Sequence, residues 1–205
     1  MIKAVCFDAD GVVQRTPSTF RASLVELAGD ADKADEFLAE VFAAERPCLT
    51  GEREFAPMLQ TVLRRWKSPV NVEQALLIWT LIEPVEETFA VVERIRSSGV
   101  HVALASNQQS HRAGIMTTQL GYAGRFDQLF YSCELGVAKP DPAYFESLLM
   151  RLEMPGDEVL FVDDHESNVR AAREVGLNAE TFHVDSGSRA LVSLLRRHGV
   201  HVSSR

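Results

Sequence analysis

The sequence is poor in cysteine, with three residues, Cys6, Cys48 and Cys133, in a chain of 205. They are widely spaced and odd in number, so they form neither a disulfide framework nor a metal-binding pattern. The N-terminal residues also lack the basic and apolar regions of a secretory signal. No apolar run approaches the roughly 18 residues that a membrane-spanning helix needs. We therefore expect a protein of the reducing cytoplasm that has no membrane partner.

Positive charge is scarce as well. Lysine and arginine number 21 against 29 aspartates and glutamates, which gives a net charge of −8. Such a chain repels the phosphates of nucleic acids, so we expect no nucleic-acid partner. An anionic substrate would need a local source of positive charge. Hydrophobic residues make up 46% of the chain, which excludes disorder, and the length suits one core domain with a small accessory domain.

Short apolar runs alternate with helical patterns along most of the chain. Residues 2–7 and four later runs have the composition of buried strands. Their alternation with helices predicts successive βαβ units, and therefore a Rossmann-like parallel sheet of the α/β class. The end of the chain, residues 202–205, is expected to fray. The later runs cover residues 100–105, 128–132, 159–162 and 179–184, and the helical patterns cover residues 86–98, 109–121, 142–154, 167–176 and 188–198.

Residues 15–84 interrupt that alternation, because they show helical periodicity alone. We predict that they form a helical bundle inserted after the first strand. The core domain would then consist of residues 1–14 and 85–205. The predicted helices cover residues 18–28, 31–45, 52–66 and 72–82, and the side chains at expected N-cap positions are Asp30, Thr50 and Asn71.

Two aspartates follow the first apolar run, in the stretch Cys-Phe-Asp-Ala-Asp-Gly-Val-Val at residues 6–13. Side chains two residues apart on a strand share a face, so Asp8 and Asp10 can point into one site beyond the strand. Two buried carboxylates need compensation, which a divalent cation with oxygen ligands provides. A carboxylate in such a site can also act as a nucleophile and form an aspartyl-phosphate. The alternative is an ordinary turn, because Asp-x-Asp-Gly is also turn chemistry.

Polar side chains follow three later strands, at the edge of a parallel sheet where ligands bind. Ser106 and Asn107 can bind an anion through a hydroxyl and backbone N–H groups, or they can cap the next helix. Lys139 precedes a proline, so it can hold a fixed positive charge for a phosphate, or it can be an ordinary surface lysine. Asp163 and Asp164 follow the fourth strand. One of them can cap a helix, but the other would then be buried at a cost.

These clusters, in the order Asp8-Ala-Asp10, Ser106, Lys139 and Asp163-Asp164, resemble the motifs of the haloacid dehalogenase-like (HAD) superfamily over essentially the whole chain. The insert at 15–84 resembles the C1-type cap of that family. The likeness is strongest to its phosphatases, such as the phosphatase domain of soluble epoxide hydrolases and sugar-phosphate phosphatases. The resemblance implies a Mg²⁺-dependent phosphatase for small soluble phosphate monoesters, such as sugar phosphates.

The resemblance also implies a role for each residue. Asp8 would attack the phosphorus and form an aspartyl-phosphate, and Asp10 would act as general acid and then as general base. Mg²⁺ would be held by the Asp8 carboxylate, the Asp10 backbone carbonyl and the Asp164 carboxylate, with Asp163 in close support. The phosphoryl group would be bound by Ser106, by Lys139 and by backbone N–H groups near Asn107.

Four further residues lie close to these motifs in the sequence. Asn168 matches, less firmly, a position near the metal in the phosphatases. Val12 stands where many members carry threonine, which removes a hydroxyl without breaking the motif. His165 and Arg112 are left out of the site, because a solvated helix start explains each as well as a substrate contact does.

Other functions on the same fold are open to the sequence. A 2-haloacid dehalogenase shares the nucleophile, but in those enzymes the second aspartate of the first motif is replaced, so Asp10 weighs against that reaction. A phosphomutase has closer chemistry, yet nothing in residues 15–84 indicates that specialisation. A catalytically silent binding module would have lost Asp8 or Lys139, and both are present. The sequence leaves open which ester is the substrate, which cap residues contact it and the oligomeric state.

Overall fold

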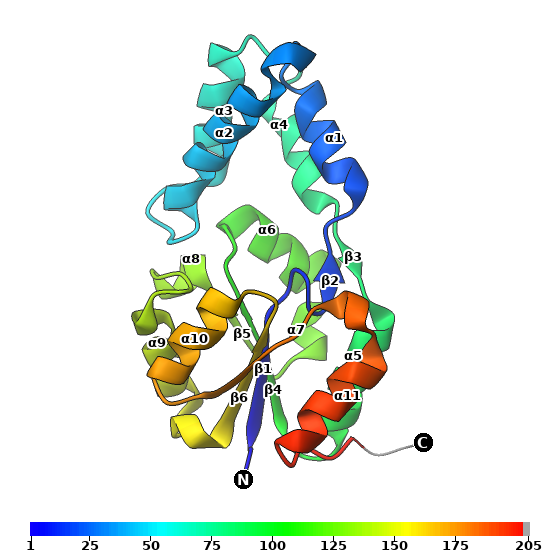
Figure 1. Cartoon of the computed structure of the whole chain (residues 1–205). Coiled ribbons are helices and arrows are strands. Elements are labelled where there is room, and N and C mark those ends of the chain that lie inside the picture. The colour runs from blue at the N-terminus through cyan, green and yellow to red at the C-terminus, as the bar shows by residue number, and fades with distance from the viewer. Residues whose placement is uncertain (203–205) are drawn as a thin grey trace.

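A five-stranded parallel sheet forms the centre of the core, seen in the lower half of Figure 1. The computed structural model describes residues 1–202, so the expected fraying at 203–205 lies outside the described residues. The strand order is β5-β4-β1-β6-β7, with every neighbouring pair parallel. This topology confirms the predicted Rossmann-like α/β class. The strands are β1 (Ala4–Phe7), β4 (His101–Ser106), β5 (Gln128–Tyr131), β6 (Val159–Asp163) and β7 (Asn178–Thr181).

Helices cover both faces of this sheet (Figure 1). Side chains alternate along a strand, so Val5 and Phe7 pack on one face and Ala4 and Cys6 on the other. Burial on both faces explains why these strands appear in the sequence as continuous apolar runs. The first face is covered by α5 (Glu86–Ser97), α6 (Ser110–Gly114), α7 (Tyr122–Arg125) and α11 (Ser188–Arg197), and the second by α8 (Ser132–Leu135), α9 (Pro142–Leu152) and α10 (Glu166–Glu174).

The helix predicted at 109–121 is divided in the structure. The helix α6 passes into η4 (Ile115–Gln119), a π-helical turn, at Ile115. By contrast, α9 begins where the sequence indicates, because the Asp141 side chain accepts a hydrogen bond from the Ala143 N–H at 2.9 Å and Pro142 occupies the first helical position. The remaining short turns of the core are η5 (Gly156–Glu158) and η6 (Val184–Ser186).

The helical region lies above the core in Figure 1 and has a hydrophobic cluster of its own. Phe37 and Leu59 are fully buried in that cluster, and the Trp79 ring packs edge-on against Phe55, with ring centroids 4.7 Å apart. The amphipathic pattern of residues 15–84 is therefore satisfied within the region itself. Its elements are α1 (Ser18–Glu26), η1 (Ala31–Lys33), α2 (Ala34–Glu45), η2 (Arg46–Cys48), α3 (Phe55–Arg65), α4 (Val72–Leu76) and η3 (Leu77–Thr80).

The three expected helix caps have different outcomes. Asn71 forms a reciprocal capping box with Gln74, as predicted. Asp30 accepts a hydrogen bond from the Asp32 N–H and so begins η1 rather than α2. The prediction for Thr50 is wrong: α3 begins only at Phe55, and the Thr50 hydroxyl bonds instead within the preceding loop.

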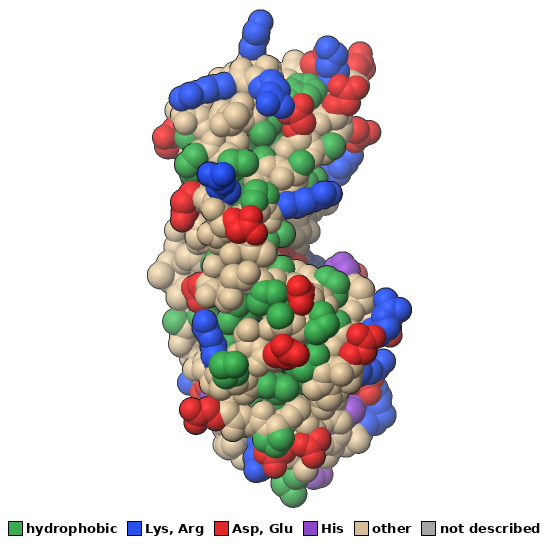
Figure 2. Space-filling model, turned by 90° about the vertical axis from the view of Figure 1, so that its left-hand side faces the viewer, with side chains coloured by type: hydrophobic (Ala, Val, Ile, Leu, Met, Phe, Trp, Pro, Cys, Tyr) green, Lys and Arg blue, Asp and Glu red, His purple; other side chains and the backbone are tan. Residues whose placement is uncertain are grey.

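A two-stranded antiparallel ribbon joins the helical region to the core. It pairs β2 (Gln14–Arg15) with β3 (Glu83–Pro84), so the chain leaves and re-enters the core side by side. Strands of two residues are too short to produce a pattern in the sequence. Figure 2 shows a waist between the two parts, hollowed on one side. Within residues 1–202, every helix is too short or too polar to cross a membrane.

Candidate active site

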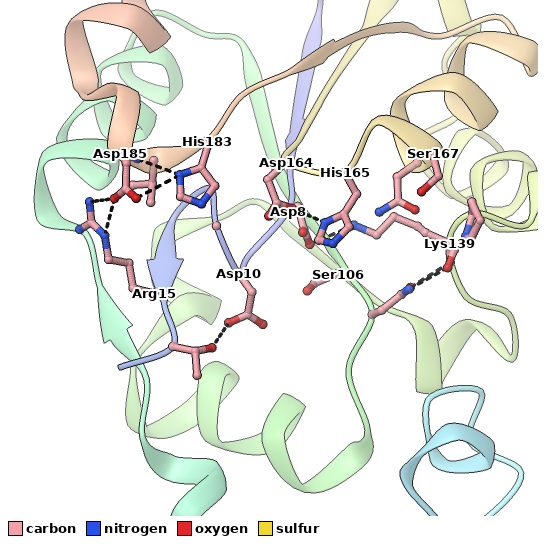
Figure 3. Close-up of a pocket in the computed structure, with 16 residues that line it drawn as sticks. Asp8, Asp10, Arg15, Ser106, Lys139, Asp164, His165, Ser167, His183 and Asp185 are labelled. Carbon is pink, nitrogen blue, oxygen red and sulfur yellow. Dashed lines mark hydrogen bonds and ion pairs between the residues drawn. The ribbon is translucent and has the colours of Figure 1, made fainter. Parts of the chain in front are cut away.

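A cavity of about 650 Å³ opens at the carboxyl ends of the strands, beside the ribbon (Figure 3). It collects the sequence-predicted residues from separate loops, and the buried Asp163 lies beneath it. Such a position is expected for a ligand site in an open parallel sheet. The predicted residues that line it are Asp8, Asp10, Ser106, Asn107, Lys139, Asp164 and Asn168, and the lining also includes His165 together with Arg15, His183 and Asp185.

Lys139 is buried at the centre of the charged groups, with 1% of its side chain exposed. Its Nζ lies 2.9 Å from Asp8 Oδ1 and 2.6 Å from Asp163 Oδ2, and it donates to the Ala105 carbonyl at 2.8 Å. Burial lowers the pKa of Lys139, but the two carboxylates raise it by more, so its pKa lies above the usual value. The alternative that Lys139 is an ordinary surface lysine is therefore excluded. The ammonium is a fixed positive charge in the cavity.

The Asp8 carboxyl follows β1 and is almost completely buried. Burial raises the pKa of Asp8 to about 6, and the Lys139 ammonium opposes that shift. At neutral pH the side chain is therefore an ionised, poorly hydrated carboxylate. A carboxylate of this kind is more basic than an exposed one and is suited to nucleophilic attack.

Asn107 fixes Lys139 through its side chain. Its Nδ2 donates to the Lys139 carbonyl at 2.8 Å, and its Oδ1 accepts from the Lys139 N–H at 2.9 Å. The Asn107 side chain therefore positions the lysine. The neighbouring Ser106 ends β4 in the cavity wall, where its Oγ accepts a hydrogen bond from Gln108 at 3.3 Å.

Asp10 is surrounded by donors that the sequence interpretation missed. Its Oδ1 accepts from Gln14 Nε2 at 3.0 Å and from Arg112 Nη2 at 2.9 Å, and its Oδ2 accepts from Gln108 Nε2 at 2.9 Å. Gln14 is itself held by the Tyr122 hydroxyl at 2.8 Å. Arg112, which the sequence interpretation left out as a residue of a solvated helix start, has a side chain that is only 11% exposed, and its guanidinium forms an ion pair with Asp10. Neither glutamine has a signal in the sequence, because helical and strand periodicity mark apolar positions only.

The two acidic residues at the end of β6 differ in position: Asp163, the last residue of the strand, is internal, and Asp164 faces the cavity. Asp163 is fully buried, and its oxygens accept from Lys139, from the His165 N–H at 2.8 Å and from Asn168 Nδ2 at 3.0 and 3.1 Å. Asp164 lines the cavity, as does Asp8. Asp163 therefore organises the loop, while Asp164 is free to bind a ligand from the cavity.

This donor set fits a hard divalent cation. The ligand atoms of Asp163, Asp164 and His165 lie within 4.8 Å of one another, and the Asp8 carboxylate faces the same cavity. Carboxylate oxygens predominate, as Mg²⁺ prefers. His165 is exposed and forms a hydrogen bond with Asp164 at 2.6 Å, which raises the pKa of the imidazole. It orients Asp164, a role that the sequence did not assign to it.

Gly11 allows the loop after β1, which carries Asp10, to approach the loop after β6, which carries Asp164. Its φ of +78° is a left-handed conformation, and a Cβ at this position would meet the carboxylate of Asp164. Gly121 has a similar φ of +69°, but a Cβ there would meet nothing within 4 Å. The two glycines thus share the same conformational strain on substitution and differ in the clash.

Gly11→Ala is expected to weaken Mg²⁺ binding by about 10–100-fold, because the new methyl group displaces Asp164. Isothermal titration with Mg²⁺ measures this effect. Gly121→Ala is the control, and should cost only the roughly 1 kcal/mol of a left-handed alanine without changing Mg²⁺ affinity. Equal Mg²⁺ affinity in both variants would contradict the assignment of Asp164 to the metal site.

Comparison with known proteins agrees with this architecture. A family model described as haloacid dehalogenase-like hydrolase matches residues 2–176. A HAD family enzyme from Bacteroides thetaiotaomicron, solved with magnesium and inorganic phosphate, superposes with a TM-score of 0.75 at 19% identity, over 88% of this chain and 94% of that one. The chain belongs to the haloacid dehalogenase-like hydrolases.

Curated relatives include both phosphatases and dehalogenases. The phosphorylated carbohydrates phosphatase of Thermotoga maritima is 23% identical over 86% of this chain and 82% of its own length. The (S)-2-haloacid dehalogenase 2 of a Pseudomonas species is 30% identical, over 46% of this chain and 42% of its own. Two further relatives are much longer, and the matched stretch spans about a tenth of their length. The comparisons thus establish the family. Because the relatives include both reactions, the reaction of this chain has to be inferred from the residues of its cavity.

Proposed function

We propose that this protein is a Mg²⁺-dependent phosphatase that hydrolyses small phosphate monoesters, such as sugar phosphates, through an aspartyl-phosphate on Asp8. The observation that carries the proposal is the buried Lys139 ammonium, 2.9 Å from the Asp8 carboxylate at the base of a polar cavity. Phosphoryl transfer depends mostly on positioning and charge neutralisation, and this arrangement provides both. The relative that acts on phosphorylated carbohydrates supports the same class of substrate.

In the proposed reaction the Asp8 carboxylate attacks the phosphorus, and the bond from phosphorus to the ester oxygen breaks. Asp10 gives a proton to the departing oxygen, then takes one from the water that attacks the aspartyl-phosphate. Ser106, Lys139 and the backbone at Asn107 hold the phosphoryl oxygens. Mg²⁺, held by Asp8, the Asp10 backbone carbonyl and Asp164, would supply further charge neutralisation. Asp163 keeps Lys139 and the Asp164 loop in place.

We propose further that residues 15–84 act as a C1-type cap over a core made of residues 1–14 and 85–205. The separate hydrophobic cluster of the helical region supports this division, as does the ribbon that joins the two parts at residues 14–15 and 83–84. A cap on such a ribbon would cover the cavity during catalysis and exclude bulk water, as active-site lids do.

Phosphate release from a panel of small phosphate esters, with Mg²⁺ and with excess EDTA, tests the proposal. We expect release in Mg²⁺ and a loss of at least about 100-fold in EDTA, because charge neutralisation disappears with the cation. Halide release from 2-haloacids is measured in parallel. EDTA-insensitive halide release without any phosphate release would show a dehalogenase instead.

A further inference from the structure

The two oxygens of the Asp10 carboxyl group have unequal surroundings. Oδ1 accepts hydrogen bonds from Gln14 Nε2 at 3.0 Å, from Arg112 Nη2 at 2.9 Å and from the Thr16 hydroxyl at 3.4 Å. Among the described residues, a single donor reaches Oδ2, namely Nε2 of Gln108 at 2.9 Å. Oδ1 is thus fixed by the protein, while Oδ2 keeps a lone pair for another partner.

Gln108 places Oδ2 next to the hydroxyl of Ser106. Its Nε2, 2.9 Å from Asp10 Oδ2, is also 3.3 Å from Ser106 Oγ. The backbone of Gln108 is fixed as well, because its N–H donates to the buried Ser132 hydroxyl at 3.0 Å. Asp10 and Ser106 both line the cavity (Figure 3). The ester oxygen of a phosphoryl group bound at Ser106 therefore has Oδ2 as its nearest Asp10 oxygen.

Gln14 holds Oδ1 from a fully buried position. Because a carboxylate only accepts hydrogen bonds, the amide nitrogen of Gln14 faces Asp10, and its amide oxygen accepts from the Tyr122 hydroxyl at 2.8 Å. The backbone of Gln14 closes the loop that carries Asp10, since its carbonyl accepts from the Gly11 N–H at 2.9 Å. Both ends of the Gln14 side chain are therefore fixed.

Tyr122 is the far end of this chain of hydrogen bonds. Its ring is fully buried and packs against Phe89 and Phe126, with ring centroids 5.1 and 6.0 Å away. Burial raises the pKa of Tyr122 above its usual value, so the hydroxyl stays protonated and donates to Gln14. The described residues that line the cavity include Asp10 but neither Gln14 nor Tyr122. Both therefore act on a substrate only through Asp10.

We propose that Gln14 and Tyr122 are positioning residues for proton transfer, and that they hold Oδ1 of Asp10 so that Oδ2 gives the proton to the departing ester oxygen. This inference rests on the proposed phosphatase function. General acid catalysis requires the donor atom within hydrogen-bond distance of the departing oxygen. A carboxyl group that is free to rotate meets this requirement for only part of the time, and its rate contribution falls accordingly.

The alternative is that these bonds only satisfy buried polar groups. The two roles differ in how the rate depends on the leaving group. An alkoxide leaves poorly without a proton, whereas p-nitrophenolate is a stable anion that needs none. A misplaced Asp10 therefore slows the hydrolysis of an alkyl ester selectively, while a general structural defect slows both esters alike. The ratio kcat/KM covers the steps up to departure of the leaving group, so the later role of Asp10 as a base does not enter the comparison.

The test measures kcat/KM in Mg²⁺ for p-nitrophenyl phosphate and for an alkyl ester, either sn-glycerol 3-phosphate or glucose 6-phosphate, whichever the wild type hydrolyses faster. In Tyr122→Phe we expect the alkyl ester to lose about tenfold and the aryl ester less than about threefold. Tyr131→Phe is the matched control. Tyr131 is also buried, but its hydroxyl accepts from Thr117 at 3.3 Å, so its removal should leave both values unaltered.

Gln14→Met provides a second variant, which keeps the length of the side chain and removes both amide bonds. The alkyl ester should lose at least about 30-fold, again with a smaller loss on the aryl ester. In the double variant Gln14→Met/Tyr122→Phe the alkyl ester should be hydrolysed no more slowly than in Gln14→Met alone, because Tyr122 acts through Gln14. A further loss of about tenfold in the double variant would contradict this order of action.

Equal losses on the two esters in Tyr122→Phe, or no loss on either, would overturn the positioning role alone, because the enzyme would still release phosphate. Hydrolysis of p-nitrophenyl phosphate by the wild type with neither alkyl ester accepted would also overturn it. If the wild type hydrolyses none of the three esters, the proposed phosphatase function fails, and the positioning role fails with it.

Discussion

Asp8→Asn is expected to lower the rate of phosphate release by at least about 10⁴-fold, because the amide can no longer attack phosphorus. The side chain keeps its size, so the cavity and the fold should be retained. Steady-state release of inorganic phosphate in Mg²⁺ measures the loss. Undiminished turnover in this variant would exclude the covalent mechanism on Asp8.

The same variant should be at least as stable as the wild type in EDTA at pH 7. The folded-state pKa of Asp8, about 6, lies above its ordinary value of 3.8. The folded protein therefore holds the proton more tightly than the unfolded chain, so ionisation of Asp8 reduces stability as pH rises through this window. Asparagine removes that cost, and Lys139 retains Asp163 as its partner. Urea denaturation gives the comparison, and a large loss of stability would contradict the electrostatic description of the site.

Lys139→Met is expected to reduce the free energy of unfolding by about 3–5 kcal/mol and to abolish phosphate release. The substitution leaves the carboxylates of Asp8 and Asp163 buried without their shared ammonium, and a buried ion pair that loses one partner is strongly destabilised. Denaturant unfolding in EDTA measures the change. A loss below about 1 kcal/mol would show that the charges are better solvated than the structure indicates.

The stability deficit of Lys139→Met should grow between pH 6 and pH 8. Without the lysine, the attraction that opposes the upward shift of the Asp8 pKa is lost, so this carboxyl titrates at higher pH in the variant. A folded-state pKa above the unfolded value means that stability falls as pH rises through it. The double variant Lys139→Met/Asp163→Asn is the control, because removing one of the two carboxylates should restore part of the stability.

The fold could be predicted from the sequence because the spacing of apolar residues indicates which segments are strands and which are helices. The five strands appear as short apolar runs, and the carboxyl ends of four of them carry the polar clusters that meet in the cavity. Asp8 and Ser106 were found for this reason, because Asp8 directly follows β1 and Ser106 ends β4, whereas Lys139 was found because it precedes Pro140 in the turn before α9. The burial of Lys139 could not be predicted from the sequence. It depends on the contact with Asp163 and on the two hydrogen bonds that the Asn107 side chain forms with the Lys139 backbone.

The surroundings of Asp10 could not be predicted. Gln14 lies on a two-residue strand, which is too short for any pattern. Arg112 lies in the middle of a five-residue helix, where a solvated arginine is equally ordinary. Both reach Asp10 only through tertiary packing, with Arg112 separated from it by 102 residues in the chain.

Trapping of the phospho-enzyme tests the central claim most directly. Protein is quenched in acid during turnover of a phosphate ester, reduced with borohydride and digested, and the peptide that contains Asp8 is analysed by mass spectrometry. Borohydride converts an acyl phosphate to an alcohol, so Asp8 should be recovered in part as homoserine, and only when substrate was present. Continued phosphate release with Asp8 unmodified, or reduction at a different carboxylate, would contradict the assignment of Asp8 as the nucleophile.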